Sequence, residues 1–150
     1  MFQPTIYPIQ TIGAGSLSVM ARPVPGEWIE DEFAGIARLG ISHIVSLLEH
    51  EEAIDVGLEE EPQLAEQYGM QFTSYPIADR CLPASIEEFA DFTRALYQGI
   101  LTGSHTVVHC RAVAHGRLIY QGTLKFLCRL PCATDRLVRP CRARMGNPIL

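Results

Sequence analysis

Hydrophobic and polar residues alternate along the chain in blocks that predict short strands and helices. Extended or β-branched apolar runs predict strands over residues 6–12, 17–21, 43–48, 71–77 and 105–108. Apolar positions at helical spacing predict helices over residues 27–39, 62–68, 85–102 and 118–130, with a further helical stretch from residue 134 to Pro140. Ser85, followed three residues later by Glu88, predicts a capping box at the start of the third helix.

Because strands alternate with helices, the pattern predicts an α/β fold, with a central, mostly parallel sheet of about five strands flanked by helices. The first two strands are separated by Gly13-Ala14-Gly15 and should form a hairpin. Trp28 is expected to anchor the core, and the acidic stretch 49–61 is expected to form a solvated face around a short helix. The 150 residues suffice for one sizeable core, so residues 1–150 are expected to form a single domain.

Charge is distributed unevenly along the chain, whose net charge is −5. The first 100 residues hold 4 basic and 16 acidic side chains, whereas the last 50 hold 8 basic and 1 acidic. The acidic first part argues against a nucleic-acid-binding module. The basic last part fits an anionic ligand, and it equally fits pairing between the two parts of the fold. No apolar run approaches the ~20 residues of a membrane helix, and the N-terminus does not resemble a signal peptide, so a cytoplasmic protein without a membrane partner is expected.

The sulfur and imidazole groups do not form a recognisable metal site. The chain has five cysteines, an odd number without a disulfide framework, and these are expected to be free thiols: Cys81, Cys110, Cys128, Cys132 and Cys141. The last three lack a fourth ligand at zinc-site spacing. His105, His109, Cys110 and His115 form a second candidate cluster, but His109 and Cys110 are adjacent on a strand and should point to opposite faces. We therefore expect no metal and no other cofactor.

The segment Thr106–Leu118 carries the chemistry that the pattern favours. A β-branched strand passes through His109 and Cys110 into a loop of small residues, and a predicted helix follows. Loop N–H groups and a helix N-terminus that converge on one point favour an anion. A helix N-terminus and a nearby arginine lower the pKa of a thiol from its ordinary value near ~8.5. Cys110 is therefore predicted to be a thiolate nucleophile beneath a phosphate cradle, with an arginine as clamp.

These residues, His-Cys-Arg-Ala-Val-Ala-His-Gly-Arg-Leu, resemble the signature loop of the cysteine-dependent tyrosine and dual-specificity phosphatases. In that family His-Cys is followed by five residues, an arginine, and a serine or threonine. Here six residues separate Cys110 from Arg117, Leu118 replaces the hydroxyl, and the usual middle glycine is absent. The resemblance extends to a hairpin over 6–21 and a helix and strand over 28–48. It implies a dual-specificity phosphatase-like fold and hydrolysis of a phosphorylated protein or small phosphomonoester through a cysteinyl-phosphate intermediate.

The resemblance also implies roles for individual residues. Cys110 would be the nucleophile, Arg117 the phosphate clamp, and Asp79 the general acid and base. Asp79 follows a predicted strand and precedes Cys110 by 31 positions, as the general acid of the family does, although taken alone it would be an ordinary turn residue. The expected substrate-binding residues are His109, Arg111, Ala112, Val113, Ala114, His115 and Gly116.

Some of these side chains have a second interpretation. His109 would orient the loop and lower the pKa of the Cys110 thiol through hydrogen bonds, or it is a strand residue bonded to backbone. Arg80 and Arg111 either help to bind the anion or are surface charges. Cys81 would form a protective disulfide with Cys110, as in some thiol phosphatases, or remain an inert thiol, which is the simpler interpretation.

Three functions therefore remain open. The first is an active phosphatase, and the second is a catalytically impaired relative that binds phosphorylated partners without turnover. The third is a rhodanese-like sulfurtransferase, which also places a cysteine on a strand-to-helix loop. Asp79 favours the first two, because sulfur transfer needs no such acid. The extra residue before Arg117 favours the second.

Overall fold

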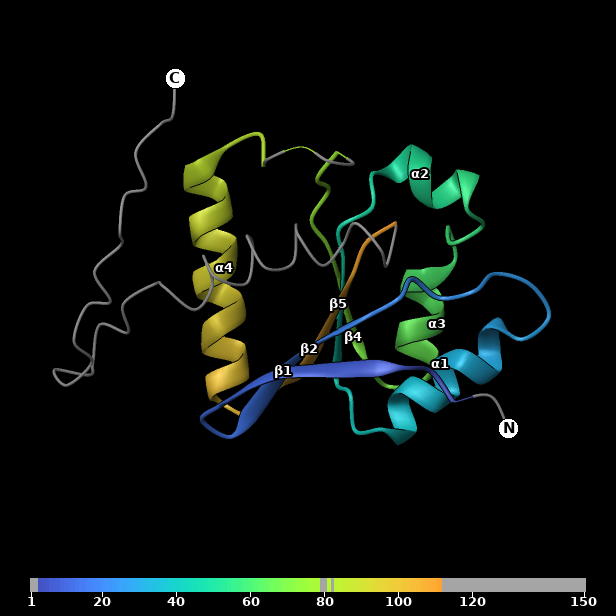
Figure 1. Cartoon of the computed structure of the whole chain (residues 1–150), viewed down its shortest axis with the longest axis horizontal. Coiled ribbons are helices and arrows are strands. Elements are labelled where there is room, and N and C mark those ends of the chain that lie inside the picture. Colours follow the sequence, from blue (N-terminus) through green and yellow to red (C-terminus); the bar gives the residue numbers. More distant parts are fainter. Residues whose placement is uncertain (1–2, 79–80, 82, 112–150) are drawn as a thin grey trace, which may run out of the picture.

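The computed structural model describes residues 3–78, 81 and 83–111, which form a five-stranded sheet with helices on both faces (Figure 1). The strands are β1 (Ile6–Ile12), β2 (Gly15–Met20), β3 (His43–Ser46), β4 (Gln71–Ser74) and β5 (His105–His109). They lie in the order β1-β2-β5-β3-β4, in which only the β1–β2 pair is antiparallel. The structure thus confirms the predicted hairpin and the mostly parallel sheet.

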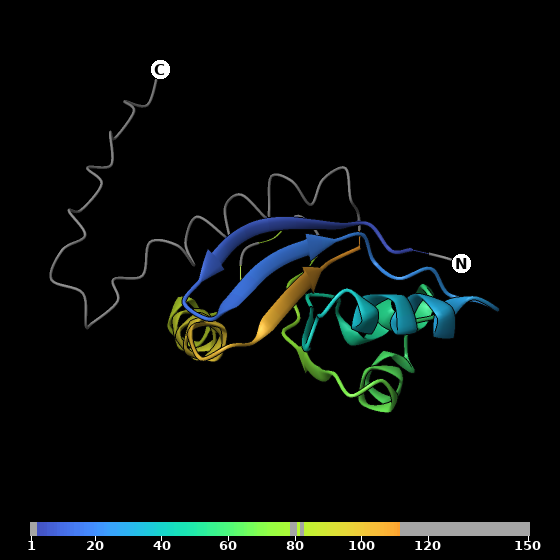
Figure 2. The same ribbon diagram turned by 90° about the horizontal axis from the view of Figure 1, so that it is seen from below.

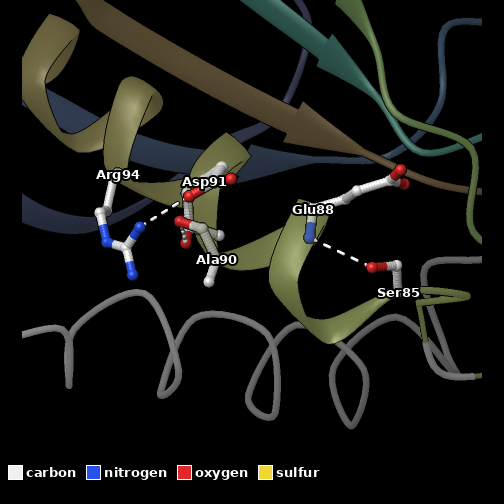
Figure 3. A network of polar contacts seen from close by, with 6 residues as sticks. Ser85, Glu88, Ala90, Asp91 and Arg94 are labelled. Atoms are coloured by element: carbon white, nitrogen blue, oxygen red, sulfur yellow. Dashed lines mark hydrogen bonds and ion pairs between the residues drawn. The ribbon is translucent and has the colours of Figure 1, made fainter.

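The part of the chain that the structure describes contains four helices: α1 (Ile29–Arg38), α2 (His50–Asp55), α3 (Glu61–Gln67) and α4 (Ile86–Leu101). Of these, α1, α3 and α4 pack on the sheet. The hydroxyl of Ser85 accepts the N–H of Glu88 at 3.3 Å, which starts α4 where the sequence predicts it (Figure 3). Farther along α4, Arg94 pairs with Asp91 at 2.7 Å. Within the described residues, no helix has the length and apolar character needed to cross a membrane. The helices predicted over 118–130 and after residue 134 lie outside the described residues.

The core consists of two apolar layers on opposite faces of the sheet. Figure 2 shows the helices that pack on them, with α4 (yellow) on one side of the sheet and α1 and α3 on the other. Alternation along β5 sends Val108 into the layer against α4 and Val107 into the layer against α1 and α3. The α4 layer contains Leu17, Val45, Leu47, Ile77, Phe89, Leu96, Ile100 and Val108. The other layer contains Met20, Phe33, Ile36, Ile41, Ile44, Leu64, Ala65, Met70 and Val107. Because β5 is central, its carboxyl end emerges between two packed layers.

A close contact fixes β2 against the turn between α4 and β5. A Cβ added to Gly15 would lie 2.1 Å from the carbonyl oxygen of Ile100 and 2.2 Å from that of Ser104. Hydrogen bonds accompany this approach, from Ala14 N–H to Leu101 at 3.3 Å and from Ser16 N–H to Ser104 at 3.2 Å. Only glycine permits this approach, which sets where β5 begins beside β2.

Two predictions about side-chain burial are wrong. Trp28 is 66% exposed, because it precedes α1 as the N-cap residue and lies off the buried stripe. The acidic stretch 49–61 is not solvated throughout, because Glu61 at the start of α3 is only 1% exposed.

Candidate active site

Cys110 lies at the carboxyl end of the central strand. It directly follows β5, which is paired with β2 on one side and β3 on the other. Its side chain is partly buried and packs against the α4 layer of the core. Parallel α/β sheets bind ligands at this edge, so the strand places the thiol where a substrate can approach.

The segment that precedes Asp79 runs on the other side of β3. Leu47, the residue after β3, donates its N–H to His109 O at 3.0 Å and accepts the N–H of Ile77 at 3.1 Å. The ladder therefore continues past β3 and β4 to His109 and Ile77, which lie one residue before Cys110 and two residues before Asp79 in the sequence. With neighbouring strands ~4.8 Å apart, the two flanking backbones lie about 10 Å from each other. Residues distant in sequence are thus brought to one edge of the sheet.

Aromatic packing holds this second segment against α4. The ring of Tyr75 stacks on Phe92 with centroids 4.4 Å apart and an interplanar angle of 19°. It also meets Phe89 at 5.7 Å in a tilted arrangement. Two residues later, Ile77 is buried in the same layer. Beyond it, Cys81 donates its N–H to Ala78 O at 2.9 Å. The backbone on both sides of positions 79 and 80 is therefore held in place.

His109 points to the opposite face from Cys110, as alternation along the strand predicts. Its Nε2 and Oε1 of Glu61 lie 2.6 Å apart, and the two side chains are 0% and 1% exposed. Its partner is thus a carboxylate of α3, and neither the backbone nor the thiol. The other ring nitrogen, Nδ1, is buried and has no hydrogen-bond partner among the described residues.

A third titratable group, Glu32 of α1, is buried beside this pair. Its Oε2 accepts the N–H of Val24 at 2.7 Å. The pKa of Glu32 is raised, and burial is the largest cause. The Val24 N–H and, to a smaller extent, the charge of His109 act to lower this pKa, whereas the charge of Glu61 acts to raise it. Two acidic groups and an imidazole therefore lie beneath the carboxyl end of β5, on the face away from Cys110.

Arg111 is tied to α2 instead of standing free above the site. Its Nη1 donates to Oε1 of Glu52 at 3.3 Å, with the two side chains 48% and 13% exposed. The other oxygen of Glu52 accepts the N–H of Glu49 at 3.2 Å and completes a capping box at the start of α2. An exposed pair of this kind contributes no more than ~1 kcal/mol. Its role is to connect the residue after Cys110 to the neighbouring helix.

Several predicted site residues lie outside the described residues: Asp79, Arg80, Ala112, Val113, Ala114, His115, Gly116 and Arg117. The structure places Cys110, His109 and Arg111 together at the carboxyl end of β5, with Cys81 exposed and not joined to Cys110 by a disulfide. Sequence reasoning missed Glu61. The signal was present, because Glu61 is in helical register with buried Leu58, Leu64 and Ala65.

The opposite end of the sheet holds a surface cavity of about 820 Å³, lined by β1, the start of β2 and residues 39–41. His105 borders it and hydrogen-bonds Ser16 Oγ at 2.8 Å through Nδ1. At ~3.3 Å per residue, β5 separates His105 from Cys110 by roughly 16 Å. His105 therefore cannot join a cluster with Cys110. Among the described residues no three His, Cys, Asp or Glu side chains are arranged to hold a metal ion.

Comparison with known proteins identifies the fold. No protein-family model and no curated protein matches the chain in sequence. A kinase associated phosphatase, with its catalytic-site cysteine replaced by serine, matches with a TM-score of 0.71 and 16% identity over 93% of this chain and 79% of that chain. A candidate phosphatase from Shewanella putrefaciens CN-32 matches with a TM-score of 0.53 and 20% identity, over 81% and 71% of the two chains. A candidate protein tyrosine phosphatase from Leishmania major matches with a TM-score of 0.55 and 16% identity, over 72% of this chain and 69% of that chain. The chain therefore has the α/β fold of the dual-specificity phosphatases.

Proposed function

We propose that this chain, which has the fold of the dual-specificity phosphatases, hydrolyses phosphomonoesters through a cysteinyl-phosphate intermediate at Cys110. One observation carries the proposal. Leu47 is hydrogen-bonded on one side to His109 and on the other to Ile77, so the backbones that lead to the nucleophile and to Asp79 end at the same edge of the sheet. A thiolate and a general acid, each from its own strand, are the two groups that this cleavage requires.

In the proposed reaction the Cys110 thiolate attacks phosphorus and a sulfur–phosphorus bond forms. The bond from phosphorus to the ester oxygen breaks, and Asp79 gives that oxygen its proton. Asp79 then takes a proton from a water molecule, which attacks phosphorus and releases inorganic phosphate and the thiolate. Arg117 and the loop from Ala112 to Gly116 would hold the phosphoryl oxygens. The substrate is a phosphorylated protein or a small phosphomonoester, and residues 1–150 act as one phosphatase-like domain.

The test is hydrolysis of an aryl phosphate by the whole chain and by Cys110→Ser. We expect activity that the substitution abolishes. We also expect iodoacetate to label Cys110 faster than the other cysteines, and phosphate or vanadate to slow that labelling by occupying the cradle. Equal labelling of all cysteines, unaffected by either anion, would falsify the assignment of Cys110. Transfer of sulfur from thiosulfate without phosphatase activity would instead identify a sulfurtransferase.

A second candidate is a relative that binds phosphorylated partners with little turnover. Six residues separate Cys110 from Arg117, where the resembled family has five. Arg111, which follows Cys110, pairs with Glu52 through Nη1 at 3.3 Å. This candidate is favoured if the chain binds a phosphopeptide and does not bind its unphosphorylated form, while the aryl phosphate is hydrolysed no faster than by Cys110→Ser.

A further inference from the structure

We propose that Glu61 is a positioning residue for Cys110 that acts through His109. This inference rests on the proposed function, because it assigns a task at the same site. Glu61 belongs to α3 and lies 48 positions before His109 in the sequence, and the 2.6 Å contact between Oε1 and Nε2 joins the two. His109 is the last residue of β5 and Cys110 is the next, so the bond anchors the residue from which the thiol is presented.

The burial of the pair is the first argument. Both side chains are almost completely excluded from solvent, and Leu58 and Leu64 are buried on the same face of α3 and the turn before it. An apolar side chain at position 61 would therefore fit the surrounding core. Burying a carboxylate and an imidazole costs desolvation free energy that their attraction offsets only in good geometry. A polar pair here is thus better explained by orientation than by stability.

The second argument concerns the imidazole ring. An ionised carboxylate accepts and cannot donate, so with Glu61 ionised the 2.6 Å contact places a proton of His109 on Nε2. The bond thereby selects one tautomer and one ring orientation. Nδ1 then remains as the buried ring nitrogen without a partner among the described residues.

Two neighbouring contacts show how His109 is held at the carboxyl end of β5. The carbonyl oxygen of His109 accepts the N–H of Leu47, so main chain and side chain of one residue are held from two directions. Glu32 is buried close to the pair and accepts the Val24 N–H through Oε2, whereas the carboxylate that contacts the His109 ring is that of Glu61. Glu61 is therefore the carboxylate that determines how His109 is held.

The experiment compares two substitutions of Glu61 with matched controls. Glu61→Gln keeps a carbonyl oxygen that can accept the Nε2 proton, whereas Glu61→Leu has a similar size and no acceptor. Glu66 is an exposed residue of the same helix, and Glu66→Gln and Glu66→Leu repeat the chemical changes away from the site. Iodoacetate labelling of Cys110 is measured for each protein with and without inorganic phosphate. The ¹⁵N spectrum of labelled histidine reports the protonation of each ring nitrogen, and His109→Gln assigns the His109 signals.

We expect Glu61→Leu to slow the labelling of Cys110 and to weaken its protection by phosphate by about tenfold, the effect of losing one strong hydrogen bond. Its His109 proton should be shared between the two ring nitrogens. Glu61→Gln should restore a protonated Nε2 and retain most of the labelling rate and protection, and both Glu66 variants should match the unmodified chain. A purely structural role would not produce this rescue of tautomer and labelling together.

The proposal is overturned if Nε2 carries no proton in the unmodified chain, or if Glu61→Leu leaves His109 signals and Cys110 labelling unchanged. Thermal unfolding shows which variants are folded, and Glu61→Met replaces Glu61→Leu if the latter is unfolded. If both are unfolded, the pair is structural and the proposal is wrong. Failure of the proposed function looks different: the unmodified chain itself then shows slow Cys110 labelling that phosphate does not affect.

Discussion

Replacing both members of the buried Glu61–His109 pair should cost far less stability than replacing one. In His109→Leu the Glu61 carboxylate stays 1% exposed and loses its 2.6 Å partner. Leaving a buried carboxylate without its partner costs ~3–5 kcal/mol. In Glu61→Leu an imidazole N–H is left buried without an acceptor, which costs ~1–3 kcal/mol. These are large fractions of the ~5–15 kcal/mol by which a domain is stable.

The double substitution Glu61→Leu/His109→Leu removes both polar groups and fills the space with apolar side chains. Replacement of a buried pair by well-packed apolar residues is often neutral, so we expect the double variant within ~1 kcal/mol of the unmodified chain. The three substitutions and the parent form a double-mutant cycle, in which we expect a coupling free energy of at least ~2 kcal/mol.

The assay is urea unfolding followed by far-ultraviolet circular dichroism, with the free energy of unfolding extrapolated to zero urea for all four proteins. Equal slopes across the four would show that the substitutions act on the folded state. Additivity of the two single effects within ~0.5 kcal/mol would mean that the side chains do not interact, and would refute the reasoning.

Three further predictions concern the acid, the loop and pH. Asp79→Asn should slow hydrolysis of an ester with a poor leaving group by ~10²–10⁴-fold and that of an ester with a very good leaving group less. If the substitution leaves the rates on both substrates unchanged, Asp79 is a turn residue. Deleting Ala114 restores the five-residue spacing of the resembled family, and Leu118→Ser restores its hydroxyl. The two changes together should raise kcat/KM on an aryl phosphate at least about tenfold. If they abolish activity instead, the longer loop is the working form. Burial lowers the pKa of His43 below 6.5, so below that pH the unfolded chain binds the proton more readily and stability falls on acidification. His43→Gln should flatten this fall between about pH 7 and 5 in urea titrations, and an unchanged slope would exclude His43 as the cause.

The sequence by itself determined the fold class and most of the element positions. Periodicity placed all five strands and the long helix α4, because each has a clear apolar pattern between turn residues. The alternation of Val107, Val108, His109 and Cys110 along one strand also predicted that the last two point to opposite faces, as they do. Local sequence patterns are sufficient to predict strands, helices and side-chain alternation, because these features depend on residues that are close together in the chain.

Only the tertiary structure decided what meets at the carboxyl end of β5. The strand order places β3 between β5 and β4, so Leu47 hydrogen-bonds both His109 and Ile77. The pairing of Glu61 with His109 depends on where α3 packs. The helical register of Glu61 with Leu58, Leu64 and Ala65 indicates a buried position, but it does not identify the partner. The prediction that Trp28 is buried was wrong for the converse reason, because an apolar side chain is buried only if another element covers it. Burial and long-range pairing depend on how the helices pack on the sheet. This packing therefore determines which side chains contact the residues around Cys110.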